Sequence, residues 1–234
     1  MMLRVLAVTV FLAAVVLVAC GRQVTPNPSN GANNGVLPGY LFVRYDTANP
    51  MDFTNVRYLI AFNTSGNGGV PYTNAYNTGY ANYSFIITVS GVNGFVAPQV
   101  CQIIRQQGGG VTCQPEQFSP SQVILTLNSN GRNNEFTIMF DRRLFYGIPP
   151  ASPTPPPPTT QPQNNWTFNF ITTDTTFHPL DALGIGGPND TSFNLPLPVN
   201  TAFDFLQQLT VPAGATRSPI PSAQLAGGEI INNP

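Results

Sequence analysis

The sequence predicts an all-β protein, a mostly antiparallel β-sandwich of about seven to nine strands joined by long loops. Apolar and polar residues alternate with a period of two in segments spread over most of the chain. Glycine, proline and asparagine cluster between these segments, where turns and loops need them. After the opening apolar run, no segment keeps a helical spacing of apolar residues convincingly. Short alternating runs separated by turn residues are typical of half-buried strands.

The chain begins with the pattern of an export signal. Residues 1–4 carry one positive charge, and residues 5–18 form an almost unbroken apolar run. A helix that spans a bilayer needs about 20 apolar residues, so this run is too short to span stably. Its length and the charge before it are typical of the apolar region of a signal peptide.

The apolar run ends in Leu17-Val18-Ala19-Cys20, with Gly21 next. This stretch resembles the lipobox of bacterial lipoproteins, an apolar residue and two smaller ones before a cysteine. The resemblance implies cleavage before Cys20 and acylation of its thiol, as by palmitate, and of the new amino group. Because Gly21 and not aspartate follows the cysteine, it also implies the outer membrane if the host has one. We therefore expect a signal peptide over residues 1–19 and a lipid-anchored protein of the cell envelope.

The remaining chain divides by composition. Residues 20–38 are rich in Asn, Gly, Pro and Ser and predict a flexible tether. We expect one β-sandwich domain over residues 39–215, interrupted by a proline-rich loop over residues 148–165, and a loosely ordered tail over residues 216–234. The proline-rich segment predicts extended polyproline II. Its use as a linker between two domains stays open, although the part after it is small for an independent core.

Each expected strand turns one set of alternating side chains towards the core. The sets are Leu41, Val43 and Tyr45; Val56, Tyr58, Ile60 and Phe62; Tyr83, Phe85, Ile87 and Val89; Val123, Leu125 and Leu127; Phe136, Ile138 and Phe140; and Trp166, Phe168 and Phe170. Residues 195–198 alternate leucine with proline, which predicts an edge strand because proline cannot donate to the ladder. Residues 200–209 fit either a helix or a strand, and residues 229–231 fit a last strand.

With Cys20 assigned to lipid, Cys101 and Cys113 remain as an even pair. Export places them in a compartment that permits disulfides. A glycine triplet between them predicts a turn, and a hairpin folded close to Gln107 would set the two cysteines opposite each other. We therefore predict a disulfide, worth about 3 kcal/mol in the chain-entropy model. A zinc site and a catalytic thiol fit less well, because the chain has a single histidine.

The chain is polar without being strongly charged. All nine basic residues are arginine, and removal of the signal leaves eight of them against ten acidic residues. The mature chain thus has no excess of basic residues from which to build a basic face, which argues against nucleic acid as a partner.

Groups that could carry catalysis are few. His178 lies close to two aspartates, but no nucleophile-elbow pattern accompanies it, so we assign no catalytic triad. Glu116, Glu135 and Asp141 could supply the two carboxyl groups of a glycosidase, although a local ion pair with the arginines that follow is the expected use of Asp141. Residues 186–191 offer oxygen ligands for calcium, but a turn rich in Asn and Asp is the commoner use of such a segment. We assign no catalytic residue, metal or cofactor.

One long connection has the composition of a binding loop. It joins two expected strands and contains Tyr72, Asn74, Tyr76, Asn77 and Tyr80. Tyrosine rings give rigid contact area and asparagine amides give adaptable hydrogen bonds, a combination that suits carbohydrate or protein. Connections of this length are usually functional or disordered. The alternative is that the tyrosines fold back and cap one end of the sandwich.

Three hypotheses about function follow. The first is a lipid-anchored, non-enzymatic β-sandwich in the cell envelope, held to the membrane through Cys20, that binds a glycan or a protein partner. The second is a surface polysaccharide hydrolase, which needs two carboxyl groups about 5–10 Å apart across a cleft. The third is a purely structural spacer or filament subunit, which an exposed unpaired strand together with a complementary groove would favour.

Overall fold

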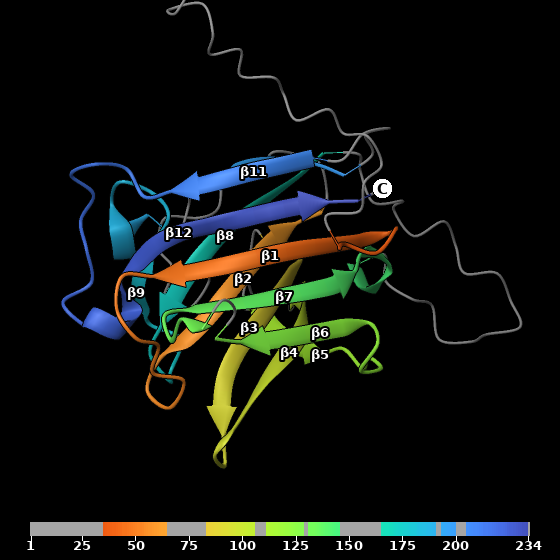
Figure 1. Ribbon diagram of the computed structural model, residues 1–234, viewed down its shortest axis with the longest axis horizontal. Helices are drawn as coiled ribbons and strands as arrows, with labels where there is room; N and C mark the ends of the chain where they lie inside the picture. Colours follow the sequence, from red (N-terminus) through yellow and green to blue (C-terminus); the bar gives the residue numbers. More distant parts are fainter. Residues whose placement is uncertain are drawn as a thin grey trace, which may run out of the picture. The chain divides into compact units, whose positions relative to one another are not determined.

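The alternating segments fold into two antiparallel sheets, one of five strands and one of seven (Figure 1). The structure, a computed structural model, describes residues 35–64, 83–105, 111–128, 131–145, 165–190, 193–199 and 205–233. The predicted all-β sandwich is confirmed. The described residues hold twelve strands, more than expected, because several strands are too short for their alternation to stand out in the sequence. No helix within these ranges is long and apolar enough to cross a membrane.

Sheet A, the smaller sheet, has the spatial order β11-β12-β1-β7-β6. Its strands are β11 (Phe205–Thr210), β12 (Leu225–Asn232), β1 (Tyr40–Thr47), β7 (Glu135–Asp141) and β6 (Val123–Leu127). Sheet B has the order β10-β8-β2-β3-β4-β5, with β9 also paired to β8. Its strands are β10 (Leu195–Pro198), β8 (Asn165–Thr173), β2 (Arg57–Asn63), β3 (Phe85–Val92), β4 (Phe95–Arg105), β5 (Val111–Pro115) and β9 (Pro179–Ala182). Short 3-10 turns are η2 (Arg142–Phe145), η3 (Gly187–Asn189) and η4 (Pro221–Ala223).

The core is an aromatic layer between the two sheets. The expected inward residues of β1, β7 and β8 are almost all fully buried. The Tyr45 ring of β1 stacks on Phe136 of β7 at 5.1 Å and on Phe170 of β8 at 4.8 Å between ring centroids. Its hydroxyl donates a hydrogen bond of 3.0 Å to the Ile171 carbonyl in sheet B. Tyr45 therefore joins the two sheets by both stacking and hydrogen bonding.

Strands from both sides of the proline-rich segment share the two sheets. β8 follows that segment and pairs with β2, while β12 pairs with β1. The proline-rich residues 146–164 lie outside the described residues. Of the ambiguous residues 200–209, the part from Phe205 onwards forms the strand β11. Tyr83 departs from its predicted face and joins a small cluster with Leu59 and Ala61, because the chain is strand-paired only from Phe85 onwards.

The tail expected to be loosely ordered instead contains a strand inside sheet A. Residues 225–232 form β12, which lies between β11 and β1. Gly227 and Gly228, whose φ angles are 141° and 153°, let the neighbouring strands approach closely. A Cβ at Gly228 would collide with the Arg44 carbonyl oxygen, and one at Gly227 with the Leu209 carbonyl oxygen. The strand includes residues 229–231, which fit a last strand in the sequence. Adjacent glycines usually indicate a loop, which is why the first half of β12 was not expected.

The strand with alternating prolines lies at the margin of sheet B, as predicted. Leu197 of β10 is fully buried and pairs with Trp166. Since proline has no N–H, the leucines make the ladder bonds to β8 and the proline nitrogens face outwards. That arrangement leaves the outer side of β10 without donors for another strand.

We expect Gly228→Ala to destabilise the protein by at least about 3 kcal/mol, because the new methyl group meets backbone rather than a side chain that can move. Gly214→Ala is the matched control, since Gly214 has a φ of 80° and its new methyl group would meet no atom within 4 Å. It should cost only about 1–2 kcal/mol of left-handed strain. Denaturant unfolding of both variants measures the difference, and equal losses would show that close strand approach at Gly228 is unimportant.

Candidate functional site

Several predicted site residues lie outside the described residues. They are Cys20, Tyr72, Asn74, Tyr76, Asn77 and Tyr80. The two ends of the Tyr/Asn loop are described and are bonded to each other and to sheet B. The Thr64 N–H donates to the Ser84 hydroxyl at 3.1 Å, and the Ser84 N–H donates to the Phe62 carbonyl at 2.7 Å. The lipid anchor and the binding loop stay predictions, and the loop leaves from a fixed base.

The predicted disulfide between Cys101 and Cys113 is confirmed, with Cα atoms 5.2 Å apart. The cysteines are diagonal neighbours on β4 and β5, not directly opposite as expected. Cys101 pairs with Pro115 and Cys113 with Ile103. The register centres the hairpin one residue beyond the expected position, and such a shift moves every cross-strand pair. The disulfide links the marginal strand β5 covalently to β4.

The three carboxyl groups considered for hydrolysis do not converge. Glu135 and Asp141 stand at the two ends of β7, roughly 20 Å apart along the strand. Glu116 follows β5 in the other sheet, where its N–H donates to the Val100 carbonyl. Asp141 makes the expected local ion pair, in which Arg143 Nε donates at 2.9 Å. That hydrogen bond with Arg143 lowers the pKa of Asp141.

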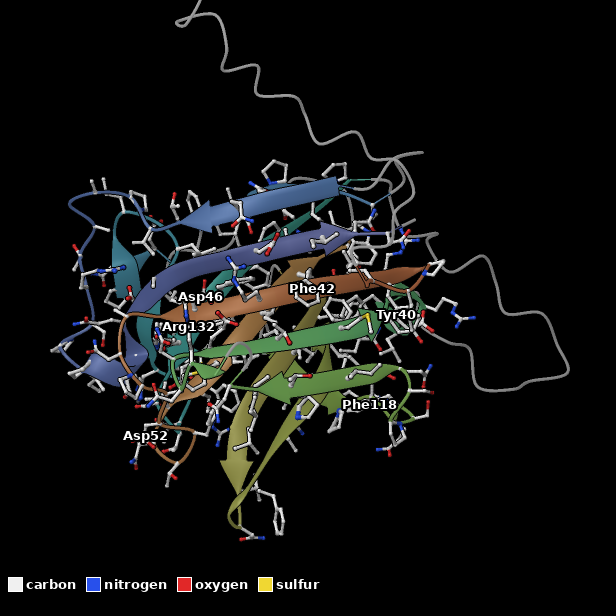
Figure 2. All side chains as sticks on the ribbon, viewed as in Figure 1. Tyr40, Phe42, Asp46, Asp52, Phe118 and Arg132 are labelled. Atoms are coloured by element: carbon white, nitrogen blue, oxygen red, sulfur yellow. A yellow bond between two sulfur atoms is a disulfide. The ribbon has the colours of Figure 1, made fainter. Side chains whose placement is uncertain are left out.

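Glu135 does have a carboxyl neighbour, because Asp46 of β1 is its cross-strand partner. The pKa of Asp46 is raised, chiefly because its carboxyl group is partly buried. The charge of the adjacent Glu135 raises this pKa further, whereas Arg44 acts to lower it. Arg44 Nε donates to Asp46 at 3.2 Å, and Figure 2 shows Arg132 at the same end of β1. The two carboxyl groups belong to neighbouring strands of one sheet, not to facing walls of a cleft. The arrangement is that of a partly buried charge network.

His178 lies in a tight turn between β8 and β9. Its Nδ1 is 2.9 Å from Asp174 Oδ2 and 2.8 Å from the Thr176 hydroxyl. Asp174 also accepts hydrogen bonds from the N–H groups of Thr176 and His178. Phe177, at a positive φ of 66°, lies under the Arg57 guanidinium. These contacts hold the turn closed. This structural role explains the presence of His178 and Asp174 without a catalytic one.

The segment considered for calcium forms η3 and the turn around it. The Gly186 N–H donates to Asp190 Oδ2 at 3.3 Å, which is the local use of an aspartate in an Asx-rich turn. Within the described ranges, no group of three or more His, Cys, Asp or Glu side chains is placed to hold a metal ion.

β6 forms an unpaired margin of sheet A. Two flanking bonds, Asn128 N–H to the Glu135 carbonyl and Asp141 N–H to the Gln122 carbonyl, show that the even-numbered residues bond to β7. Because hydrogen-bonded and non-bonded pairs alternate in an antiparallel ladder, Val123, Leu125 and Leu127 turn their N–H and C=O groups outwards. We call the outward-facing N–H and C=O groups of these three residues the open edge. Among the described residues, none pairs with this side of β6.

An apolar row crosses the outer face of sheet A and ends at the open edge. Successive cross-strand partners place Ile231, Phe42, Met139 and Ile124 in one line, and Figure 2 marks Phe42 near the middle of β1. Ile124 is 38% exposed. The next row is polar, where Arg44 Nη1 donates to Glu229 at 2.8 Å. No charged residue occurs between residues 117 and 131 around β6.

The open edge is the feature that sequence reasoning missed. Alternation predicted β6 but not its position in the sheet, because the order of strands depends on pairing across the whole chain. The uncharged stretch around β6 was a usable signal, since natural edge strands are commonly protected by charge or proline.

Comparisons of the chain with protein-family models, curated proteins and solved structures return no match.

We expect part of the stability to depend on the Asp174 carboxylate. Burial acts to raise its pKa, but the hydrogen bonds from His178 and Thr176 outweigh burial and lower it from 3.8 to about 2. A carboxyl group with a lowered folded pKa stabilises above its unfolded pKa and loses that contribution as pH falls through the folded pKa. The melting temperature of Asp174→Asn should therefore lie below that of the native chain at pH 5 and approach it towards pH 2. A constant difference over this range would exclude a role for the ionised group.

Proposed function

We propose that this chain is the folded head of a lipid-anchored cell-envelope protein that binds a protein partner and performs no catalysis. The observation that carries the proposal is the open edge of β6, with the apolar row that ends on it. An extended segment of another protein would pair with Val123, Leu125 and Leu127 and add a strand to sheet A.

The chemistry of β6 supports this mode of binding. Strand addition obtains affinity from backbone hydrogen bonds and specificity from the side chains that flank them. The uncharged surroundings of β6 impose no charge desolvation on an incoming apolar segment. Two of the other margins differ, since prolines block β10 and a disulfide holds the short β5. β11, the other margin of sheet A, has neither device. On this view the partner segment is uncharged and carries apolar side chains at alternate positions.

Two other functions receive less support. Glycan binding by the Tyr/Asn loop is the second candidate, because Thr64 and Ser84 fix the base from which that loop leaves sheet B. A polysaccharide hydrolase has less, since Glu135 and Asp141 stand at opposite ends of β7 and Glu116 follows β5 in the other sheet. The Asp46–Glu135 pair lies on one sheet face, where a substrate could not enter between the two groups.

The anchor is tested by Cys20→Ser in the full-length chain. Without the thiol no diacylglycerol can be attached, and we expect the protein to leave the membrane fraction and to lose palmitate labelling. Gly21→Ala is the control, because it keeps the cysteine. Continued membrane fractionation of Cys20→Ser would refute the lipid anchor and leave the open edge unaffected.

The open edge is tested by Leu125→Pro, read out by a photo-crosslinking residue at Ile124 in the cell envelope. The Leu125 N–H faces outwards, so proline removes a donor that the folded chain does not use. We expect crosslinking to the partner to be lost.

Two matched variants complete this test. Leu125→Ala removes similar packing but keeps the N–H, and it should retain the crosslink. Thr126→Pro removes an N–H that donates to β7 and should destabilise the fold by about 3 kcal/mol or more. Leu125→Pro should destabilise the fold no more than Leu125→Ala does, because the Leu125 N–H has no partner in the ladder with β7. If Leu125→Pro and Leu125→Ala crosslink equally, the partner does not pair with β6.

A further inference from the structure

The β3–β4 hairpin carries the two most exposed large apolar side chains of the described residues. Phe95 is 78% exposed and Val92 is 62% exposed. They are direct cross-strand partners and form the last pair before the turn. Asn93 and Gly94 make that turn with φ angles of 53° and 83°, as a two-residue type I′ turn requires. We call residues 92–95 the hairpin tip.

The hairpin tip stands away from the core. Figure 1 shows β3 and β4 running past β6 to a turn beyond the other strands. On β4 the first fully buried residue after the tip is Val100. Val100 lies five positions after Phe95, roughly 17 Å along β4. On β3 the fully buried Val89 lies three positions before Val92, roughly 10 Å along the strand. The two side chains are therefore presented at the end of a short projection.

The hairpin lacks charge up to its last residue, Arg105. Residues 83–104 contain no Asp, Glu, Arg, Lys or His. By contrast Ile185, which is 61% exposed, lies beside a charged segment, since its carbonyl accepts from Thr216 next to Arg217. Transfer of an uncharged apolar tip out of water is favourable, whereas transfer of charged groups is costly. The hairpin tip is the described surface best suited to an apolar medium.

We propose that the hairpin tip inserts Phe95 and Val92 into the boundary between headgroups and acyl chains of the bilayer. A lipid surface fits better than a protein groove, because the tip is convex and carries no charge for specific pairing. Proteins bind interfaces in this way through apolar side chains, with aromatic rings at headgroup depth. The hairpin tip would give the head a second membrane contact.

This inference rests on the proposed lipid anchor, which brings the head to the bilayer. Fourteen residues, 21–34, separate Cys20 from the first described residue. Their composition, rich in Asn, Gly and Pro, predicts a tether with a reach of about 20 Å. That reach is comparable with the length of the projecting hairpin, so the head can lower its tip to the bilayer. The contact would then fix how the open edge is oriented above the membrane.

The test places a tryptophan at the hairpin tip of the full-length lipidated chain. Phe95→Trp is reconstituted in phosphatidylcholine vesicles whose acyl chains carry bromine near the headgroup end. The native Trp166 is fully buried in the core and gives a constant background. Ile185→Trp is the matched control, because it exposes the same ring on a surface with charged neighbours. Both changes are at exposed positions and should leave the fold intact.

We expect the added emission of Phe95→Trp to shift to shorter wavelength and to be quenched by the brominated lipid, with no quenching for Ile185→Trp. Absence of quenching at position 95, with the chain still bound to vesicles, would overturn the inference and leave the anchor standing. Equal quenching of both variants would also overturn it, because the head would then contact lipid without preference for the tip. Failure of the lipidated chain to bind vesicles at all would contradict the anchor itself.

Discussion

Contact between two apolar sheet faces is the constraint on which the rest of this structure depends. Tyr45 shows it most directly, since its ring stacks on Phe136 within sheet A and on Phe170 of sheet B. Its hydroxyl bonds across the core to Ile171. Buried hydrogen bonds add to this contact, since the Leu225 N–H of β12 donates to Asp181 of β9 and the Thr172 hydroxyl of β8 donates to the Ala223 carbonyl. Gly227 and Gly228 serve the pairing within sheet A, because they allow β12 to approach β1 and β11.

Packing two sheets face to face buries their inner faces but leaves their marginal strands unpaired on one side. Proline nitrogens point outwards on β10, and the Cys101–Cys113 bridge restrains β5. β6 has neither device, although sheets usually protect such a strand. The hairpin tip is a second departure, because Phe95 stays in water where most large apolar residues are buried. Both features lie in stretches without charge, and both point to binding.

Sequence alone predicted the sandwich because alternation is a local property. The inward-facing residues of β1, β7 and β8 could be predicted from the period-two alternation alone. The disulfide followed from counting cysteines, but its diagonal geometry did not, since register depends on a turn whose centre moved by one residue. The order of strands depends on contacts such as β1 with β12, between residues far apart in the chain. For the same reason the place of β12 inside sheet A and the open edge could not be predicted, and local glycine and charge patterns gave only indirect signals.

The central claim is that β6 offers unpaired backbone to a partner. Amide hydrogen exchange along β6, resolved by residue with NMR on the purified chain, tests it most directly. The account predicts alternation, in which the amides of Leu125 and Leu127 exchange fast while those of Ile124 and Thr126 are protected by β7. Protection of Leu125 and Leu127 equal to that of their neighbours would contradict the claim, because their outward N–H groups would then be paired already.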